Sequence, residues 1–354
     1  MLTSVVALVD LRKNRDSPVR EAIDLIGGID DLNNEQREAV IKVGVFGVNT
    51  PHYSTVGIVQ DIVNAFNKSP KVYLAESDNY QGAALDRLQI WKELFTDRVQ
   101  PYDLSRDPDT FKLRVENPIR DVVLQLSKII LKPRAFICTH VLRSYHKGSI
   151  LKNLFGLPPS PKKAQYHKNE VFYNLLTQLY KTIGGIDLSI LDGSRFCHHM
   201  DSLPTDLIAV GRDPVAVETV GAILASLKLS KHETIKAFTE KGYGVSDIDK
   251  IDIVGESFDE MKERCEKTLL QLKKRFSERP KPWSPTGALS KLISSGFFVS
   301  PNRRTIGDIE SALIEEDPRA EGRSQIIYTN LQRRVKKGIL MSEKTDDSVV
   351  FWKI

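Results

Sequence analysis

Cysteine is scarce in this chain of 354 residues, which contains only Cys138, Cys197 and Cys265. An odd number of scattered cysteines argues against a disulfide framework and against a metal cluster held by cysteines alone. The sequence has no run of about 18 apolar residues, so it predicts no membrane span. It also lacks the N-terminal pattern of a signal peptide. These absences together favour a cytoplasmic protein.

Three common functional motifs are missing as well. The chain contains no Gly-x-Gly-x-x-Gly, no Gly-x-x-x-x-Gly-Lys-Ser/Thr and no Gly-x-Ser-x-Gly sequence. Their absence disfavours a standard dinucleotide site, a P-loop and the nucleophile elbow of serine hydrolases. The excess of positive charge is also small, because 51 Lys and Arg residues against 46 Asp and Glu residues give a net charge of +5. The composition therefore indicates an ordinary globular protein.

What the sequence does contain is an alternation of apolar, strand-like runs and helical segments. We expect strands at residues 4–11, 40–48, 71–75, 134–138, 188–191, 207–210 and 251–254. Helices are expected between them, among others at residues 55–66, 118–131 and 169–183. This order predicts an α/β fold with a mainly parallel sheet covered by helices.

A loop-rich segment at residues 148–167 carries the densest group of candidate binding residues. It brings Lys152, Asn153, Gly156 and His167 close together in the sequence. Cationic side chains, an amide and a small backbone residue suit an anionic ligand. The sequence therefore predicts a site for a phosphate or a carboxylate, without naming the molecule that carries it.

Further polar residues interrupt or follow the predicted strands. Lys42 lies inside an apolar strand, where a buried lysine needs a partner. Because ligands gather at the carboxyl ends of parallel strands, we expect Lys42, Lys152, Asn153 and Asp192 to converge in space. Two alternatives stay open, namely a structural ion pair of a lysine with Asp192 or Asp213, and a helix-capping role for Asp213 before Pro214. The predicted ligand-binding residues are Lys42, Lys152, Asn153, Gly156, His167, Asp192 and Asp213.

Four histidines, His140, His146, His198 and His199, raise the question of a metal, because imidazole binds zinc, iron and nickel. Adjacent histidines do not share a face of a helix or a strand, and no recognised ligand spacing is present. The pattern favours solvated loop histidines, so no metal site is predicted. Whether these histidines bind a metal is a question for the structure, and the sequence names no cofactor.

Several short motifs occur in a fixed order: VALVDL, VREAIDLIGGI, VIK, TH, LKNLFG, LSILDG and GRDPVAVETV. In this order they resemble the domain of unknown function 362 family over about residues 4–256, and Lys152-Asn153 match its motif directly. The resemblance implies no defined activity. Members often carry an appended ferredoxin module, which needs a four-cysteine run that this chain lacks. The chain also has Val43-Gly44 in place of the family's Pro-Asn, and Glu218 in place of its usual Asp.

The C-terminal part predicts a separate small domain. Helices are expected at residues 286–295, 305–314 and 325–337, the second opened by a capping box of Thr305 and Asp308, and strands at 339–342 and 348–352. This order resembles a winged helix-turn-helix domain whose third helix contacts DNA. The alternative is a winged helix used for protein contacts, because cations at the end of a helix also complement its dipole. The cations expected to meet nucleic-acid phosphates are Arg319, Arg323, Arg333, Arg334, Lys336 and Lys337.

The domain prediction is an α/β domain at residues 1–256, a helical linker with a Pro-rich hinge at 257–283, and the winged-helix-like domain at 284–354. The favoured hypothesis is a regulator that binds an anionic small molecule and double-stranded DNA. The alternative is an enzyme of undefined chemistry, acting on a phosphorylated or carboxylated substrate, whose winged helix serves assembly. A non-catalytic interaction protein is the third possibility. The sequence decides neither whether a reaction is catalysed nor whether the protein is an oligomer.

Overall fold

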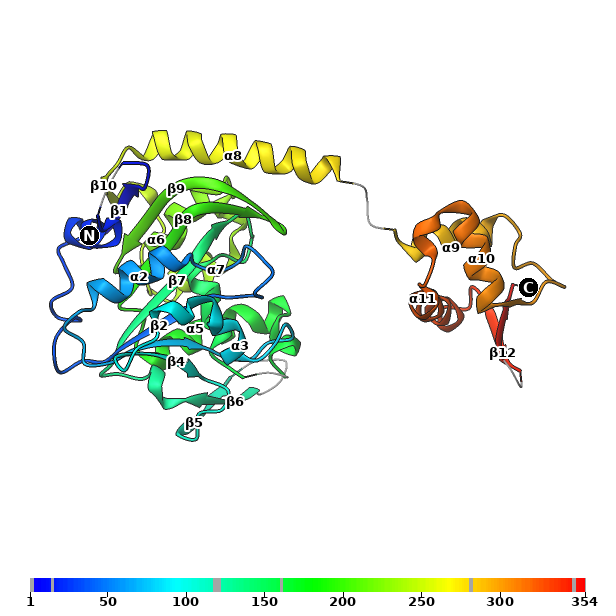
Figure 1. Ribbon diagram of the computed structural model, residues 1–354, viewed down its shortest axis with the longest axis horizontal. Helices are drawn as coiled ribbons and strands as arrows, with labels where there is room; N and C mark the ends of the chain where they lie inside the picture. The colour runs from blue at the N-terminus through cyan, green and yellow to red at the C-terminus, as the bar shows by residue number, and fades with distance from the viewer. Residues whose placement is uncertain are drawn as a thin grey trace. The chain divides into compact units, whose positions relative to one another are not determined.

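The computed structural model describes residues 3–13, 16–116, 122–159, 162–279, 283–345 and 348–353. The chain divides into two compact units, Met1–Ser277 and Glu278–Ile354 (Figure 1). The hinge expected at Pro280-Lys281-Pro282 lies outside the described residues. Among the described helices, none is long and apolar enough to cross a membrane.

The first unit is built on an eight-stranded sheet with the order β10-β1-β9-β8-β7-β2-β3-β4. The two strand pairs that involve β9 are antiparallel, and the other neighbouring pairs are parallel. The prediction of an α/β fold with a mainly parallel sheet is therefore confirmed. The strands are β1 Ser4–Asp10, β2 Ala39–Val43, β3 Val72–Glu76, β4 Val99–Asp103, β7 Ala135–Arg143, β8 Leu188–His198, β9 Asp201–Gly211 and β10 Ile251–Gly255.

Helices cover both faces of this sheet, because side chains of a strand alternate between its two faces. One core packs alternate strand residues against α1 Pro18–Leu25 and α2 Val56–Ala65, with α3 Ala84–Leu88 beside them. The opposite core packs the remaining strand residues against four longer helices and the short helix α4 Ile150–Asn153 (Figure 1). The longer helices are α5 Asn169–Ile183, α6 Pro214–Leu224, α7 Glu233–Glu240 and α8 Phe258–Glu278.

Helix α8, which the sequence analysis places in the linker, packs on the first unit. Its buried residues Met261, Cys265, Leu269 and Leu272 recur at three- and four-residue spacing. They belong to the same core cluster as the buried residues of α5, α6 and α7. The apolar stripe of this helix is thus used inside the first unit. Phe276, in its last turns, keeps 45% of its surface exposed.

The prediction of a helix at residues 118–131 is wrong. Residues 117–121 lie outside the described part of the chain, and β6 Val122–Ser127 pairs antiparallel with β5 Thr110–Val115. Val122, Leu124 and Leu126 are buried, whereas Val123 between them is 58% exposed. This period of two is that of a half-buried strand. A long apolar run predicts a helix here because its length masks this alternation.

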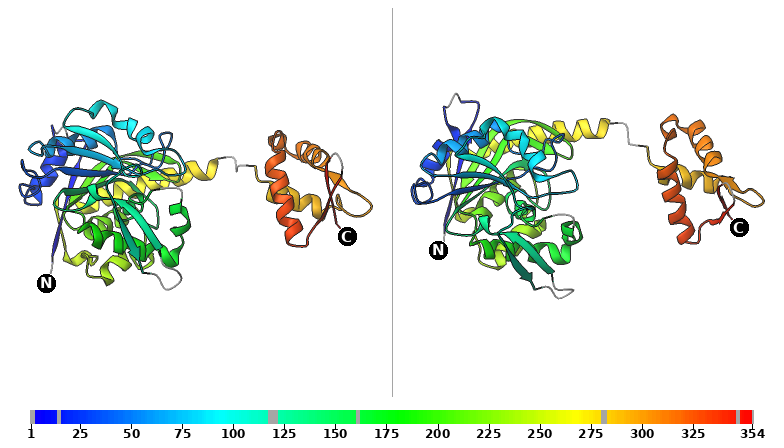
Figure 2. Two further views of the ribbon diagram at one scale, coloured as in Figure 1. Left: turned by 90° about the horizontal axis from the view of Figure 1, so that it is seen from below. Right: turned by 60° about the horizontal axis from the view of Figure 1, so that its bottom comes forward.

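The second unit has a core of its own, formed by Leu289, Ile309, Leu313, Ile327, Leu331 and Phe351 among others. Three of its elements are helices, drawn in orange to red in Figure 2, and a small sheet has the order β11-β13-β12. The expected capping box is confirmed, since Thr305 and Asp308 bond reciprocally at the start of the second helix. The elements are α9 Pro285–Ser294, β11 Arg304–Thr305, α10 Ile306–Glu316, α11 Ser324–Lys336, β12 Met341–Lys344 and β13 Val349–Trp352.

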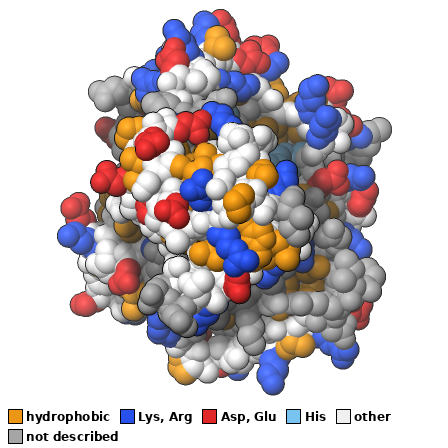
Figure 3. Space-filling model, turned by 90° about the vertical axis from the view of Figure 1, so that its right-hand side faces the viewer, with side chains coloured by type: hydrophobic (Ala, Val, Ile, Leu, Met, Phe, Trp, Pro, Cys, Tyr) orange, Lys and Arg blue, Asp and Glu red, His pale blue; other side chains and the backbone are white. Residues whose placement is uncertain are grey.

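The surface carries both signs of charge side by side. On the face shown in Figure 3, Lys and Arg side chains are interspersed with Asp and Glu side chains. This mixing agrees with the mild net charge of +5. Selective attraction of an anion therefore has to come from a local arrangement of charges.

Candidate functional site

The first unit contains a pocket of about 820 Å³. Its lining includes Val45 just after β2, Glu76 at the end of β3 and Arg143 at the end of β7. The short helix α4 Ile150–Asn153 contributes Lys152 and Asn153. The pocket thus lies where three parallel strands end, which is where ligands bind in open α/β sheets.

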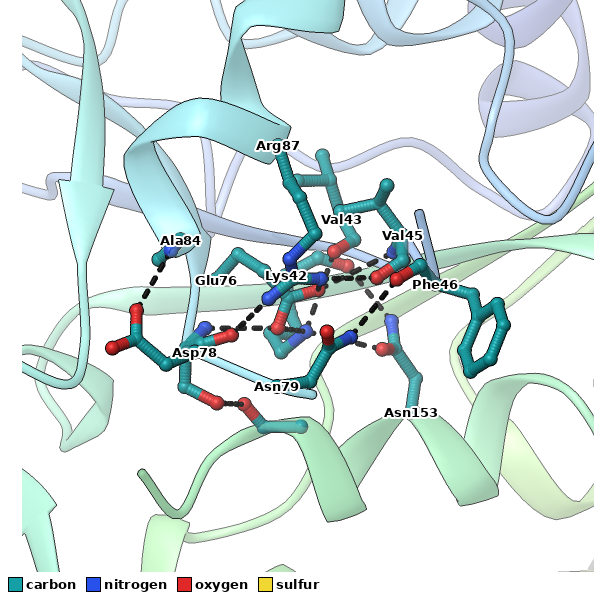
Figure 4. Close-up of polar contacts among 12 residues, drawn as sticks. Lys42, Val43, Val45, Phe46, Glu76, Asp78, Asn79, Ala84, Arg87 and Asn153 are labelled. Carbon is teal, nitrogen blue, oxygen red and sulfur yellow. Dashed lines mark hydrogen bonds and ion pairs between the residues drawn. The ribbon is translucent and has the colours of Figure 1, made fainter. Parts of the chain in front are cut away.

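A buried ion pair supports one wall of the pocket. Lys42 Nζ donates to Glu76 Oε1 at 2.8 Å, and the two side chains are 0% and 4% exposed. The parallel register of β2 and β3 sets Lys42 beside Ala75, so that Glu76 follows on the neighbouring strand. Arg87 Nη1 lies 3.8 Å from Glu76 Oε2 (Figure 4). Each charge therefore has a partner, as buried charges require.

Asn153 and Gly156 lock this ion pair to helix α4. Asn153 Oδ1 accepts from Lys42 Nζ at 3.1 Å, and its Nδ2 donates to the carbonyl of Lys42 at 3.1 Å (Figure 4). A Cβ at Gly156 would lie 2.7 Å from Lys42 Nζ. Glycine is thus needed for the close approach. The sequence predicts that Lys42 and Asn153 bind ligand. In the structure their polar atoms form hydrogen bonds with each other.

Glu218 holds the N-terminal end of helix α4 in place. Its carboxylate accepts from the backbone N–H groups of Ser149 at 2.8 Å and of Leu151 at 2.9 Å, at the start of the helix. Gly148 has a φ of +90°, and a Cβ there would lie 2.8 Å from Glu218 Oε1. A negative charge at the N-terminus of a helix also complements the helix dipole. Glu218 therefore anchors the helix that carries Lys152.

Two cations on the pocket wall form no ion pair, although the Glu218 carboxylate acts on Arg143 at longer range. Among the described residues, no carboxylate lies within salt-bridge distance of Lys152 or Arg143. Arg143 donates from Nε and Nη2 to the carbonyl of Gly148, and the Tyr145 ring lies 5.2 Å from Arg143 Cζ and 5.6 Å from Lys152 Nζ. Burial and the nearby cations lower the pKa of Lys152 well below its ordinary value. An anion in the pocket would relieve this repulsion.

Two more lysines surround the pocket, and both have acceptors. Lys163 Nζ donates to Ser77 Oγ at 2.8 Å, and burial lowers the pKa of Lys163 to about 8. Lys147 Nζ donates to the carbonyl of His167 at 2.9 Å and lies 3.2 Å from His167 Nδ1. Burial, followed by the Lys147 and Lys152 charges, lowers the pKa of His167 to about 4. The His167 ring is therefore neutral near pH 7.

His140 and His52 add neutral imidazoles to the lining. His140 is 5% exposed, and its Nδ1 accepts from the N–H of Val141 at 2.7 Å, so the ring proton of its neutral form is on Nε2. Burial and the Arg143 and Lys152 charges lower the pKa of His140 well below its ordinary value. The same causes lower the pKa of His52 to about 4. These rings can give and accept hydrogen bonds without adding charge.

Asp192 and Asp213 do not line this pocket. Asp192 lies within β8, and its carboxylate accepts from the N–H of Thr55 at 2.6 Å and from the N–H of Ser194 at 2.9 Å. Asp213 caps α6 by accepting from the N–H groups of Val215 and Ala216. The structure thus brings Lys42, Lys152, Asn153, Gly156 and His167 together, and gives the two aspartates structural partners instead. The capping alternative for Asp213 matches its geometry.

The pocket shows no arrangement suited to a metal or to a thiolate. Within the described ranges, no group of three or more His, Cys, Asp or Glu side chains is placed to hold a metal ion. His198 bonds with Ser144 Oγ at 2.6 Å, and His199 stacks on Phe276 with ring centroids 4.2 Å apart. Burial raises the pKa of Cys197 to about 12, so its thiol stays protonated. The chemistry of the site therefore rests on cations and imidazoles.

Sequence reasoning missed several residues of this pocket, among them Arg143, Tyr145 and His52. Arg143 ends β7, so its place after an apolar strand was a usable signal. Tyr145 follows in the loop after that strand. His52 lies in the loop after β2, and nothing in its local pattern marks it.

The second unit holds the cations predicted to contact nucleic acid, and they differ in environment. Arg334 is 8% exposed and donates to the carbonyls of Thr286 and Asn330, so it supports the fold. Arg319 pairs with Asp317 at 2.7 Å. The remaining four cations are exposed: Arg323, Arg333, Lys336 and Lys337. Helix α11 has no acidic residue, and its exposed side also presents Gln325, Ile326 and Thr329.

A family model described as "Domain of unknown function (DUF362)" matches residues 40–223. The match contains β2, β3, β7, β8 and β9, together with α4 and the whole of the Lys42–Glu76–Asn153 network. It ends before α8 and the second unit. No curated protein matches the chain.

Proposed function

Since the chain belongs to the domain of unknown function 362 family, whose name gives no activity, we propose from its pocket that the first unit binds a small anionic molecule. The observation that carries this proposal is Lys152, on which only cations act, beside Arg143, which forms no ion pair, on the wall of a pocket of about 820 Å³. Like charges held together without an ion-pair partner raise the energy of the empty site. A phosphate or a carboxylate supplies the missing charge.

The proposal fixes roles for the surrounding residues. Lys152 supplies an ammonium group when the anion is bound, Arg143 a planar donor that suits two oxygens of one anion, and His140 Nε2–H a neutral donor. The Lys42–Glu76 pair takes no part in charge recognition because its charges satisfy each other. It holds the strand ends at which the site is built.

Binding of inorganic phosphate is expected to weaken about 10- to 100-fold when Lys152 is changed to Met, because a charge-assisted hydrogen bond is lost. Isothermal titration calorimetry on the full chain measures this change. Lys228→Met is the matched control, since Lys228 is exposed in the first unit. Equal affinity of the two variants would show that phosphate binds elsewhere or not at all.

The same titration should depend on pH. The pKa of Lys152 is lowered in the empty pocket, whereas a bound anion favours the ammonium form. Binding therefore takes up a proton, and affinity falls as pH rises through the pKa of the empty site, by up to about tenfold per pH unit. Heats measured in two buffers of different ionisation enthalpy report the proton uptake, which Lys152→Met should remove.

The second unit, we further propose, is a winged helix-turn-helix domain that binds double-stranded DNA. In support, its helices and strands follow the order α9-β11-α10-α11-β12-β13, and its small sheet joins all three strands. The exposed side of α11 combines Arg333 and Lys336 with Gln325 and Thr329, and has no carboxylate. Cations of this kind meet phosphates, and amide or hydroxyl side chains meet base edges.

Together these proposals describe a regulator in which an anion controls DNA binding. If the two sites are coupled, saturating phosphate should change the affinity of the full chain for a random-sequence duplex by about fivefold or more at constant ionic strength. Fluorescence anisotropy of labelled duplex measures the change, and Lys152→Met should abolish it. An unchanged affinity in the unmodified protein would leave the two units functionally independent.

A further inference from the structure

Lys152 differs from the other lysines around the pocket in what its amine contacts. Lys42 donates to Glu76 and Asn153, Lys163 to Ser77, and Lys147 to His167. For Lys152, the described part of the chain offers the face of Tyr145 at 5.6 Å and no hydrogen-bond acceptor. The Lys152 amine is therefore available to a ligand.

The surroundings of this amine are those of a nucleophilic lysine. Lys152 is half-buried on the pocket wall, and the Arg143, Lys147, Lys163 and Lys42 cations act on it from strands, helices and loops around the pocket. Cationic neighbours and burial disfavour the ammonium form, as their effect on the pKa of Lys152 indicates. A neutral lysine amine attacks carbonyl carbon, which an ammonium group cannot do.

The lining also supplies the groups that such an attack needs. The Nε2–H of His140 is a neutral donor, fixed in that tautomer by the N–H of Val141, and can bond a carbonyl oxygen. Arg143 can hold a carboxylate or phosphate of the same molecule. The titratable and charged groups that face this region are Lys42, Glu76, Arg143, Tyr145, His146, Lys147, Lys163, His52, His140, His167, Cys197 and His199, and Glu218 acts on Arg143.

We propose that Lys152 forms a reversible imine with a small molecule that carries both a carbonyl group and a carboxylate or phosphate, such as an α-keto acid or a phosphorylated aldehyde. The amine nitrogen bonds to the carbonyl carbon, both amine protons leave with the carbonyl oxygen as water, and a C=N bond remains. No oxidant or reductant is needed. This inference rests on the proposed anion-binding function, because it names the ligand class of the same pocket.

The test traps the imine by reduction. The full chain is incubated with pyruvate or with glyceraldehyde 3-phosphate, reduced with cyanoborohydride, and mapped by peptide mass spectrometry. Lactate and glycerol 3-phosphate carry the same anions without a carbonyl and serve as control ligands. We expect about one adduct per chain, located at Lys152, decreased by inorganic phosphate and absent with the control ligands.

Three variants separate the imine from anion binding. Lys152→Arg keeps a cation but cannot form an imine, so it should retain most phosphate binding and lose the adduct. Lys152→Met should lose both, and Lys228→Met, on the surface, should lose neither. Circular dichroism spectra that superimpose on that of the unmodified protein show that each variant is folded.

The outcomes distinguish this inference from the function on which it rests. An adduct confined to Lys152 and lost in Lys152→Arg supports the imine. Phosphate binding without an adduct, or adducts spread equally over exposed lysines, overturns the imine and leaves the anion pocket intact. An adduct at Lys152 in a protein that does not bind phosphate supports the reactive amine and overturns the anion-binding proposal.

Discussion

Replacing Lys42 with Met is expected to lower the free energy of unfolding of the first unit by about 3 kcal/mol, because a buried carboxylate loses the closer of its two cationic partners and keeps only Arg87 at 3.8 Å. The charge left behind is that of Glu76, whose side chain is 4% exposed. The same change removes the donor to Asn153 Oδ1. It therefore loosens the contact between two strands and helix α4 at once.

The measurement has to report on the first unit alone, because two units need not unfold together. Trp91 is fully buried in the first unit, whereas the other two tryptophans, Trp283 and Trp352, belong to the second. In a background with Trp283→Phe and Trp352→Phe, urea denaturation followed by tryptophan fluorescence reads the first unit. The m-value should stay constant if only stability changes.

A surface ion pair provides the matched control. Lys68 Nζ lies 3.6 Å from Asp30 Oδ1, with side chains that are 58% and 93% exposed. Its replacement in Lys68→Met is expected to cost less than about 1 kcal/mol. Adding Glu76→Gln to Lys42→Met should recover part of the loss, since the buried carboxylate charge that lost its closer partner is gone. A loss in Lys42→Met no larger than in Lys68→Met would refute the structural role assigned to the pair.

Changing Arg323, Arg333 and Lys336 together to Ala is expected to reduce the salt dependence of DNA binding markedly. Each phosphate contact contributes roughly −0.9 to the slope of log K against log salt, so three contacts contribute roughly −2.7. This slope amounts to an affinity loss of about 40-fold between 50 and 200 mM salt in the unmodified protein, beyond whatever other contacts add. The variant should lack that share and bind more weakly at low salt.

Fluorescence anisotropy with the full chain at several salt concentrations measures both quantities. Arg334 is left unchanged because its guanidinium bonds to Thr286 and Asn330 inside the unit, and its loss would disturb folding. The control replaces Lys228, an exposed lysine of the first unit, with Ala. If the triple variant keeps the slope of the unmodified protein, α11 does not contact phosphates, and a protein-interaction role for this unit is favoured.

Local patterns were sufficient where the interaction itself is local. Alternating apolar runs predicted the α/β sheet, Asp213 before Pro214 indicated a helix cap, and Thr305 with Asp308 indicated a capping box. In the helix cap and the capping box the two partners lie within a few residues of each other, so the spacing carries the geometry. The prediction of a helix that includes residues 122–127 was wrong because a short apolar segment fits both a helix and a strand.

The candidate site could be predicted only in part, because its partners come from distant segments. The sequence by itself singled out Lys42 as a buried charge in need of a partner, and Lys152-Asn153 as a cation and an amide in one loop. Only the tertiary structure chose Glu76 as that partner, through the parallel register of β2 with β3. It also placed Lys152 beside Arg143 with no carboxylate in ion-pair contact with Lys152. This arrangement depends on strand ends that meet in space, so the spacing of residues along the chain cannot reveal it.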